Sequence, residues 1–359
     1  IRDRFCMSGG SHTSDTGPVR NPHDPTRGSG GSSSGSAALV AAGEVDMAIG
    51  GDQGGSIRMP SSFCGTVGMK PTHGLVPYTG ILPIDPPVDH AGPITANVAD
   101  NALLLEVIAG ADGIDGRQAE PRTEAYTDAL GESIAGLRIG VLSQGFGGPS
   151  AESDVDESVR AAAAQLARLG ANVSEVSVPL HSMAGALLLP IMQSSIHTLL
   201  HTDGGGIGHE DLFVPGLLDR LGRWRERADE LPETVKTGLL YTEILRRRYG
   251  YRYYAKAMNS VRSVRAAYDA VLREVDLLLL PTTPMKATPL PPQDAPREVV
   301  VAAAFSPVAN TQPFNYSHHP ALSIPCGRSQ GLPVGFMLVG RPWEETTLYR
   351  VAHAFEQSQ

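Results

Sequence analysis

The chain has 359 residues, of which 41% are hydrophobic and 19% charged, and its formal net charge is −9. This length and apolar content can bury a large core in one or two domains, so a globular protein is expected. An acidic chain offers no basic surface to neutralise phosphates, which leaves a nucleic-acid partner without electrostatic support and favours small ligands.

The cysteines and the apolar runs suggest where the protein works. Cys6, Cys64 and Cys326 are too few to pair completely in disulfides, and their spacing fits no zinc-binding pattern, so a cytoplasmic location is expected. Apolar runs such as 277–280 end at a proline after a few residues, so no membrane association is expected. The first residues lack a methionine and the apolar core of a signal peptide, which indicates a chain cut at its N-terminal side.

Two glycine-rich loops surround the first predicted helix. Residues 1–35 are rich in glycine, serine and proline, which predicts irregular structure. Small apolar residues at 36–42, followed by Gly43, predict a short buried helix, and a strand is expected at 45–49. The second glycine-rich loop, 50–58, follows directly and can approach a ligand closely through its backbone.

The remaining chain alternates between helical and strand patterns. A helix is predicted at 97–109, and a β-α-β unit at 137–142, 154–169 and 172–178. Helical patterns dominate 181–275. Further strands are predicted at 277–280, 321–325 and 334–339, followed by a last helix at 344–355. This alternation predicts an α/β fold with a sheet covered on both faces.

The first glycine-rich loop has two interpretations. Residues 30–36 could be a flexible linker by composition, but a buried helix begins at the last serine, which fixes the loop at a helix N-terminus. Backbone N–H groups there favour an oxyanion or an ionised hydroxyl. The segment 31–35 also matches the nucleophile elbow of α/β-hydrolases with Ser33 at its centre, although 20–25 before it cannot form the required strand.

Neither a metal nor a cofactor is predicted. His197 and His201 are spaced to share a helix face, with His209 or Asp211 as a third ligand. No glutamate follows the first histidine, and one such pair is weak evidence for a metal. The sequence also contains no phosphate-binding loop and no dinucleotide fingerprint.

Three stretches together resemble the amidase signature family almost residue by residue. They are GGSSSGSAA at 30–38, GDQGGSIR at 51–58 and GMKPT at 68–72. Ser32 and Ser56 are 56 − 32 = 24 residues apart, as are the two catalytic serines of that family. The resemblance continues through 92–94, 280–282, 315–325 and 332–335, and so covers essentially the whole chain.

The resemblance implies a fold and a domain organisation. The expected fold is α/β, with a mixed β-sheet covered by helices on both faces and with the N-terminal part missing. One incomplete amidase domain would span 1–359. Its parts would be the catalytic loops at 1–125, the β-α-β unit at 126–180, a helical subdomain at 181–275 and a C-terminal core segment at 276–359.

The family's mechanism implies roles for the serines and the glycine-rich loop. Ser56 would attack the amide carbonyl, and Ser32, next to a cis peptide bond in the family, would pass the proton to a neutral lysine. The backbone N–H groups of Gln53, Gly54, Gly55 and Ser56 would form the oxyanion hole. Removing one such donor typically slows an enzyme roughly a hundred- to a thousandfold.

The family's catalytic lysine lies farther upstream than the 31 residues that precede Ser32, so this chain does not contain it. Lys70 matches a family lysine that is not the base. Three interpretations stay open: a fragment of a longer enzyme, one piece of a clipped enzyme, or a truncated inactive relative. Asp52 and Arg58 are expected to form an internal ion pair that shapes the loop.

The substrate pocket should be mainly apolar with a few directed polar groups. Met7 stands where relatives line the acyl pocket, and Val88 is a candidate neighbour. The expected substrate is a small aliphatic or aromatic carboxamide, cleaved to a carboxylic acid and ammonia. Expected partners are this amide, an N-terminal segment that supplies the lysine, and a second copy in a homodimer, with no nucleic acid and no membrane.

Within the family, 52–53 and 76–80 look more like the stand-alone amidases of nitrile-degrading bacteria than like a transamidating subunit. Three other functions stay open beside this one. They are an inactive protein that retains the fold, the A-type subunit of a tRNA-dependent amidotransferase, and an esterase that uses Ser33.

Overall fold

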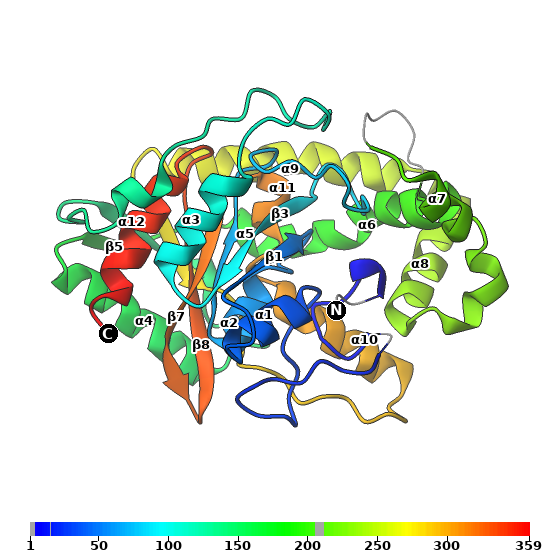
Figure 1. Cartoon of the computed structure of the whole chain (residues 1–359), viewed down its shortest axis with the longest axis horizontal. Coiled ribbons are helices and arrows are strands. Elements are labelled where there is room, and N and C mark those ends of the chain that lie inside the picture. Colours follow the sequence, from blue (N-terminus) through cyan, green and yellow to red (C-terminus); the bar gives the residue numbers. More distant parts are fainter. Residues whose placement is uncertain (1–3, 15, 205–211) are drawn as a thin grey trace.

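One mixed sheet of eight strands forms the centre of the protein (Figure 1). The structure is a computed structural model that describes residues 4–14, 16–204 and 212–359. The strand order is β1-β3-β2-β7-β8-β6-β4-β5. Strand β4 pairs parallel with β5 and β6, and the other neighbours pair antiparallel. The strands are β1 (Met47–Asp52), β2 (Val67–Lys70), β3 (His90–Thr95), β4 (Arg138–Leu142), β5 (Asn172–Val176), β6 (Leu277–Pro281), β7 (Ala321–Ser329) and β8 (Leu332–Val339).

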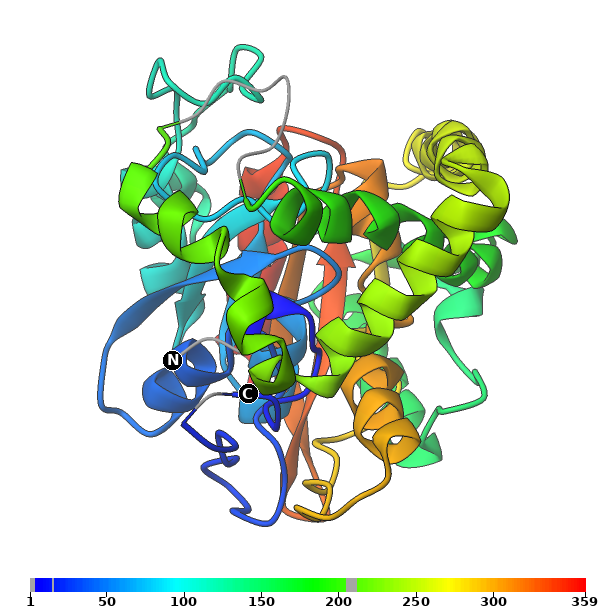
Figure 2. The same cartoon turned by 90° about the vertical axis from the view of Figure 1, so that its right-hand side faces the viewer.

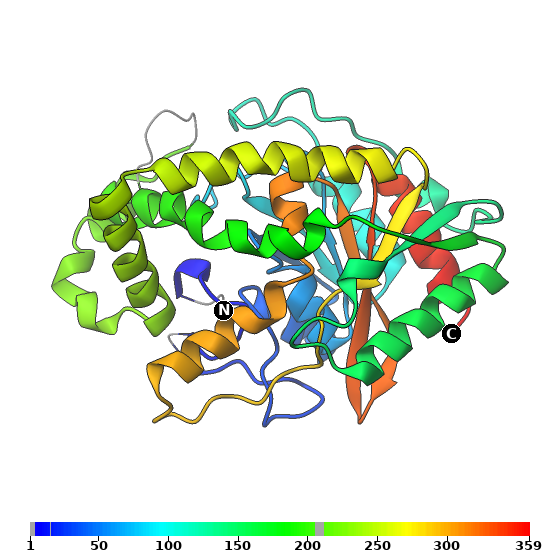
Figure 3. The same cartoon turned by 180° about the vertical axis from the view of Figure 1, so that it is seen from behind.

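Strand β6 shows why helices cover both faces of the sheet. Its leucines alternate, so Leu277 and Leu279 enter one apolar cluster while Leu278 and Leu280 enter another. The first cluster includes side chains of α3 (Val98–Ile108), α4 (Ser153–Arg168) and α12 (Glu345–Glu356). The second includes side chains of α5 (Leu180–Ala184), α9 (Arg252–Val271) and α11 (Pro313–Ser317). Figure 1 shows α3 and α12 in front of the sheet, and Figure 3 shows α9 crossing it from behind.

Most predicted elements form within one to three residues of their expected bounds. The α/β prediction and the sheet covered on both faces are confirmed. The helix predicted at 97–109 is α3, whose N-cap Asn97 accepts a hydrogen bond from the N–H of Asp100 at 2.8 Å. The strand predicted at 45–49 begins two residues later, as β1.

Several elements were not predicted from the sequence. They include β2, β3, α2 (Arg58–Cys64) and α10 (Arg297–Phe305).

The short helices not yet named, predicted or not, complete the chain. They are η1 (Arg4–Cys6), α1 (Ser34–Ala41), η2 (Tyr126–Ala129), η3 (Ser143–Gly145), η4 (Gly185–Leu187), α6 (Leu188–Ile196), η5 (His197–His201), α7 (Pro215–Leu221), η6 (Trp224–Glu230) and η7 (Ser306–Val308). The longer α8 (Glu233–Tyr249) precedes α9.

The helices between 180 and 271 form the helical region that the sequence predicted. Figure 2 looks onto α7 and α8, with the N-terminal segment in dark blue behind them. Met7 belongs there to one apolar cluster with Ile196, Leu199 and Val235. The start of the described chain is therefore part of the same apolar cluster as α6, η5 and α8.

One long helical segment was not anticipated from the short uninterrupted apolar runs. Among the described residues, Leu180–His201, 22 residues, has the length and composition to cross a membrane. Buried helices of soluble proteins meet the same criterion. Ile191, Ile196 and Leu199 of this segment lie in apolar clusters, and the segment thus contributes to the core.

Candidate active site

The two glycine-rich loops lie against each other. Ser32 and Ser33 precede α1, and Ser56 lies between β1 and α2. The N–H of Ser33 donates to the carbonyl oxygen of Ser56 at 3.3 Å. The hydroxyl of Ser33 accepts from the N–H of Gly51 at 3.1 Å and donates to the carbonyl of Gly51 at 3.2 Å. These contacts hold the two loops together.

The three candidate serines have different environments. Ser32 is fully buried, and the Gly31–Ser32 peptide bond is cis, which confirms the expectation of a cis bond beside this serine. Ser56 is 6% exposed and lines a cavity. Ser33 is fully buried away from that cavity, with its hydroxyl bonded to Gly51, so its placement does not support a nucleophile elbow.

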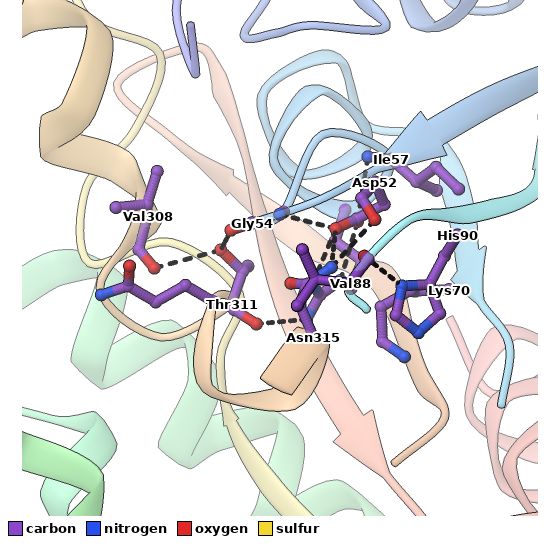
Figure 4. Close-up of polar contacts among 12 residues, drawn as sticks. Asp52, Gly54, Ile57, Lys70, Val88, His90, Val308, Thr311 and Asn315 are labelled. Atoms are coloured by element: carbon purple, nitrogen blue, oxygen red, sulfur yellow. Dashed lines mark hydrogen bonds and ion pairs between the residues drawn. The ribbon is translucent and has the colours of Figure 1, made fainter. Parts of the chain in front are cut away.

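An ion pair shapes the loop that carries Ser56, and Figure 4 shows its acidic member, Asp52. Asp52 and Arg58 are both fully buried and are joined by two hydrogen bonds of 3.0 Å, which confirms the expected pair. The Asp52 carboxylate also accepts the N–H of Gly55 at 2.6 Å and that of Ile57 at 3.1 Å. Burial raises the pKa of Asp52, but the Arg58 charge and the hydrogen bonds outweigh it and lower this pKa to about 2. The carboxylate is therefore ionised.

The segment at 311–315 completes this network from the other end of the chain. Arg58 donates to the carbonyl oxygen of Thr311 at 2.9 Å and to the side-chain oxygen of Asn315 at 2.7 Å. Asn315 donates to the backbone oxygen of Asp52 at 2.9 Å, and the Thr311 hydroxyl donates to the carbonyl oxygen of Gly54 at 2.6 Å. Both flanks of the glycine-rich loop are thereby held in place.

The predicted oxyanion donors are not equivalent. The N–H of Gly55 already donates to Asp52, which removes it from the donor set predicted from the sequence. Gly55 has φ +135°, and a Cβ there would lie 2.2 Å from the Thr311 hydroxyl, so this position requires glycine for close packing. Among the described residues, the N–H groups of Gln53, Gly54 and Ser56 have no protein acceptor and stay as predicted donors.

A mainly apolar cavity contains Ser56. Its empty space is about 590 Å³, part of which is open to solvent. Met7 and Val88, predicted to contact substrate, both line it, at 5% and 4% exposed. The sequence did not reveal its other apolar lining, which includes Met59, Ile84, Ile191, Met192, Phe305 and Val308. It also missed the polar lining, which includes Asp85, Ser195 and Tyr316.

None of the chain's lysines lines this cavity. Lys70 is fully buried and its Nζ donates to the carbonyl oxygen of Pro71 at 3.0 Å. Burial and the nearby Arg58 charge lower the pKa of Lys70 well below its usual value. Lys286 forms ion pairs with two carboxylates elsewhere, and the remaining lysines, Lys236 and Lys256, also lie outside the lining.

The candidate metal ligands form other contacts. The rings of His197 and His201 meet edge to face with centroids 5.6 Å apart, and His197 hydrogen-bonds to the hydroxyl of Tyr251 at 2.9 Å. His209 and Asp211 lie outside the described residues. In the described part of the chain, no three His, Cys, Asp or Glu side chains are grouped so that they could hold a metal ion.

Comparison with known proteins identifies relatives along the whole chain. The family model described as Amidase matches residues 2–349. An enantioselective amidase of Rhodococcus rhodochrous is 44% identical over 365 residues, which cover 100% of this chain and 70% of that protein.

A second kind of relative is similar over the same span. The A-type subunit of the glutamyl-tRNA(Gln) amidotransferase of Moorella thermoacetica is 41% identical over 362 residues, covering 99% of this chain and 72% of that protein. The crystal structure of the corresponding subunit of Thermotoga maritima superposes with a TM-score of 0.81 at 32% identity, covering 100% of this chain and 72% of that one.

Proposed function

Because this chain belongs to the amidase signature family of amide-hydrolysing enzymes, we propose that it cleaves small carboxamides through an acyl-enzyme on Ser56. The observation that supports this reaction is the position of Ser56 in a mainly apolar cavity, beside the N–H groups of Gln53 and Gly54, which have no protein acceptor. An apolar wall suits the acyl part of an amide, and free N–H groups suit its carbonyl oxygen.

The reaction divides into two steps. The Ser56 oxygen attacks the amide carbonyl, Ser32 relays the Ser56 proton to a base, and the N–H groups stabilise the oxyanion. When the C–N bond breaks, the nitrogen takes up this proton and leaves as ammonia. Water then attacks the acyl-enzyme, returns one proton to the Ser56 oxygen and releases the carboxylic acid.

The base in this proposal is a lysine from polypeptide outside the 359 residues. Two observations support that assignment. No lysine of the chain lines the cavity, and Lys70, the lysine nearest to Ser56 in sequence, is buried with its Nζ bonded to Pro71. In this proposal, that polypeptide is either joined to the chain or associated with it after cleavage.

A fluorophosphonate probe tests the assignment of the nucleophile. The purified protein is incubated with the probe, and denatured and native intact masses are followed by peptide mapping, with Ser56→Ala as the control. We expect one adduct on Ser56 and an additional upstream polypeptide in the native mass. An adduct on Ser33 would instead indicate an esterase, and no adduct without an upstream polypeptide would indicate an inactive remnant.

A second function is favoured by one observation, the 41% identity to an amidotransferase subunit. In that case the same serine would release ammonia for a partner instead of for solution. Ammonia release from simple carboxamides, measured without and with a tRNA-dependent amidotransferase partner, separates the two functions. Hydrolysis without a partner supports the stand-alone amidase, and strict dependence on one supports the subunit.

A further inference from the structure

A single buried carboxylate lies in the wall of the cavity that contains Ser56. Asp85 is 1% exposed, and it is the one acidic side chain among the described lining residues, none of which is basic. The hydroxyl of Ser194 donates to its Oδ1 at 2.7 Å, and that of Ser195 donates to its Oδ2 at 3.0 Å. A carboxylate can accept about four hydrogen bonds, so two protein donors leave part of this capacity unused.

The negative charge of Asp85 has no counter-charge in the described part of the chain. Burial raises the pKa of this carboxyl to about 7, the serine hydroxyls lower it, and the charge of Asp89 raises it further. No basic group contributes to this balance. Asp52, at the start of the glycine-rich loop that carries Ser56, is by contrast paired with Arg58.

The loop that carries Asp85 is held rigidly. Asp89 accepts the N–H groups of Ile84 and Asp85 at 2.9 and 3.0 Å. Three histidines bind the next three carbonyl oxygens: His73 to Pro86 at 3.0 Å, His318 to Pro87 at 2.8 Å, and His90 to Val88 at 2.7 Å. Figure 4 shows the last of these contacts.

The histidines act as neutral N–H donors. Burial lowers the pKa of His73 to about 4 and that of His318 to about 2, and it lowers the pKa of His90 well below its usual value. The rings of His73 and His318 also stack with centroids 4.2 Å apart. The hydrogen bonds from these rings to the loop therefore do not require a charged histidine.

We propose that Asp85 determines substrate specificity by binding a protonated amine on the acyl part of the carboxamide. This inference rests on the proposed function of the same cavity. An unpaired buried carboxylate is costly, and an ammonium group supplies both the missing counter-charge and charge-assisted hydrogen bonds. The substrate class is thus amino-carboxamides, with the apolar wall contacting the methylene groups between the two ends.

Matched ligands test the proposal without catalysis. Each pair replaces one ammonium by a methyl group, from glycinamide with propanamide to δ-aminovaleramide with hexanamide. Dissociation constants are measured by calorimetry at pH 8 on the Ser56→Ala variant, which binds without turnover. For at least one pair, we expect the amine to bind about tenfold or more tightly than its isostere.

Two further substitutions, each added to the Ser56→Ala background, assign the effect. Asp85→Asn keeps the shape and can still bond to both serine hydroxyls, and we expect it to abolish the preference for the amine. Asp46→Asn, at an exposed position, should leave the preference unchanged. An unchanged preference in Asp85→Asn would overturn the proposal.

The pH dependence gives a readout that needs no Asp85 variant. The titratable groups that bear on Asp85 are Asp89 in the same loop, Tyr254 of α9 and Tyr316 of α11. Burial raises the pKa of both tyrosines, so they stay neutral. Between pH 8 and pH 5 Asp85 becomes protonated while the amine of δ-aminovaleramide, a primary alkylamine, stays charged, and the preference for it should fall. A flat preference contradicts the proposal.

The outcomes separate the two proposals. If Ser56 is labelled and, in every pair, the isostere is hydrolysed at least as well as the amine, the role of Asp85 is wrong and the amidase function stands. If neither ligand of any pair binds and Ser56 stays unlabelled, both proposals fail.

Discussion

Two buried aspartates, Asp52 in the loop that carries Ser56 and Asp85 in the cavity wall, have opposite surroundings. Asp52 is paired with Arg58, and its pKa is lowered to about 2. Asp85 has two serine hydroxyls and no basic partner, and burial raises its pKa to about 7. Because both side chains are almost fully buried, the difference comes from their partners and not from burial.

This difference matches two roles. Asp52 and its partners position the glycine-rich loop, and Asp85 is proposed to recognise the substrate. A loop that presents N–H groups to an oxyanion must be fixed before substrate arrives, and Arg58, Thr311 and Asn315 fix it. A wall that recognises a charged ligand must keep unused bonding capacity until the ligand supplies a partner. The following experiments test each side of this contrast.

The largest effect should come from removing the nucleophile. Ser56→Ala is expected to lower kcat for amide hydrolysis by about 10⁴-fold or more, since catalytic units fail when one member is lost. The dissociation constants of the amide ligands should change little. Steady-state kinetics and calorimetry measure the two quantities, and residual activity near that of the unaltered protein would assign the nucleophile elsewhere.

Removing the partner of Asp52 should strongly destabilise the fold. Arg58→Met leaves a buried carboxylate unpaired, and we expect the free energy of unfolding to fall by about 3–5 kcal/mol in urea denaturation. Arg160→Met is the control, because the Arg160–Glu175 pair is 50% and 65% exposed and should contribute less than about 1 kcal/mol. Equal losses of stability in the two variants would contradict the structural importance of the buried Asp52–Arg58 pair.

Removing the charge of Asp85 should raise the free energy of unfolding, whereas removing Arg58 should lower it. Since the pKa of Asp85 is raised above its usual value of 3.8, its contribution is present at low pH and is lost as pH rises through about 7. Asp85→Asn should therefore raise the free energy of unfolding by about 2 kcal/mol at pH 8 and by much less at pH 5. Urea denaturation at both pH values measures this, and destabilisation at pH 8 would show a paired carboxylate.

The smallest effect should come from one hydrogen bond to the glycine-rich loop. Thr311→Val removes the contact to the Gly54 carbonyl and should cost about 1 kcal/mol of stability. It should also lower kcat up to about tenfold with little change in KM, because the Gly54 N–H is less well positioned. Thr127→Val, which loses a hydrogen bond to Glu106 far from the cavity, should lower stability without changing kcat.

Local patterns predicted much of the fold. The β4–α4–β5 unit and α3 follow from apolar periodicity, which reports which face of an element is buried. Strand β3, with the sequence HAGPIT, was missed because its glycine and proline are typical of turns. Its pairing with β1 and β2 stabilises the strand in spite of these residues.

The candidate site likewise contains residues that the sequence predicted and residues that only the structure reveals. Ser32, Ser56 and the donors in the second loop were identified because they are close together in sequence and match a family motif. Asp85 precedes two prolines and looks like part of a turn, and its partners Ser194 and Ser195 are about 110 residues away. Only the folded arrangement brings them to one cavity.

The contact between Asn315 and Asp52 has a consequence for synthesis. The two residues are separated by 263 positions, so the ribosome makes Asn315 long after Asp52. At about 5–20 residues per second, this interval is roughly 13 to 53 s. During that time the nascent chain holds Ser56 in a loop without its last anchors, and the hydrolytic geometry can be completed only after Asn315 has been made.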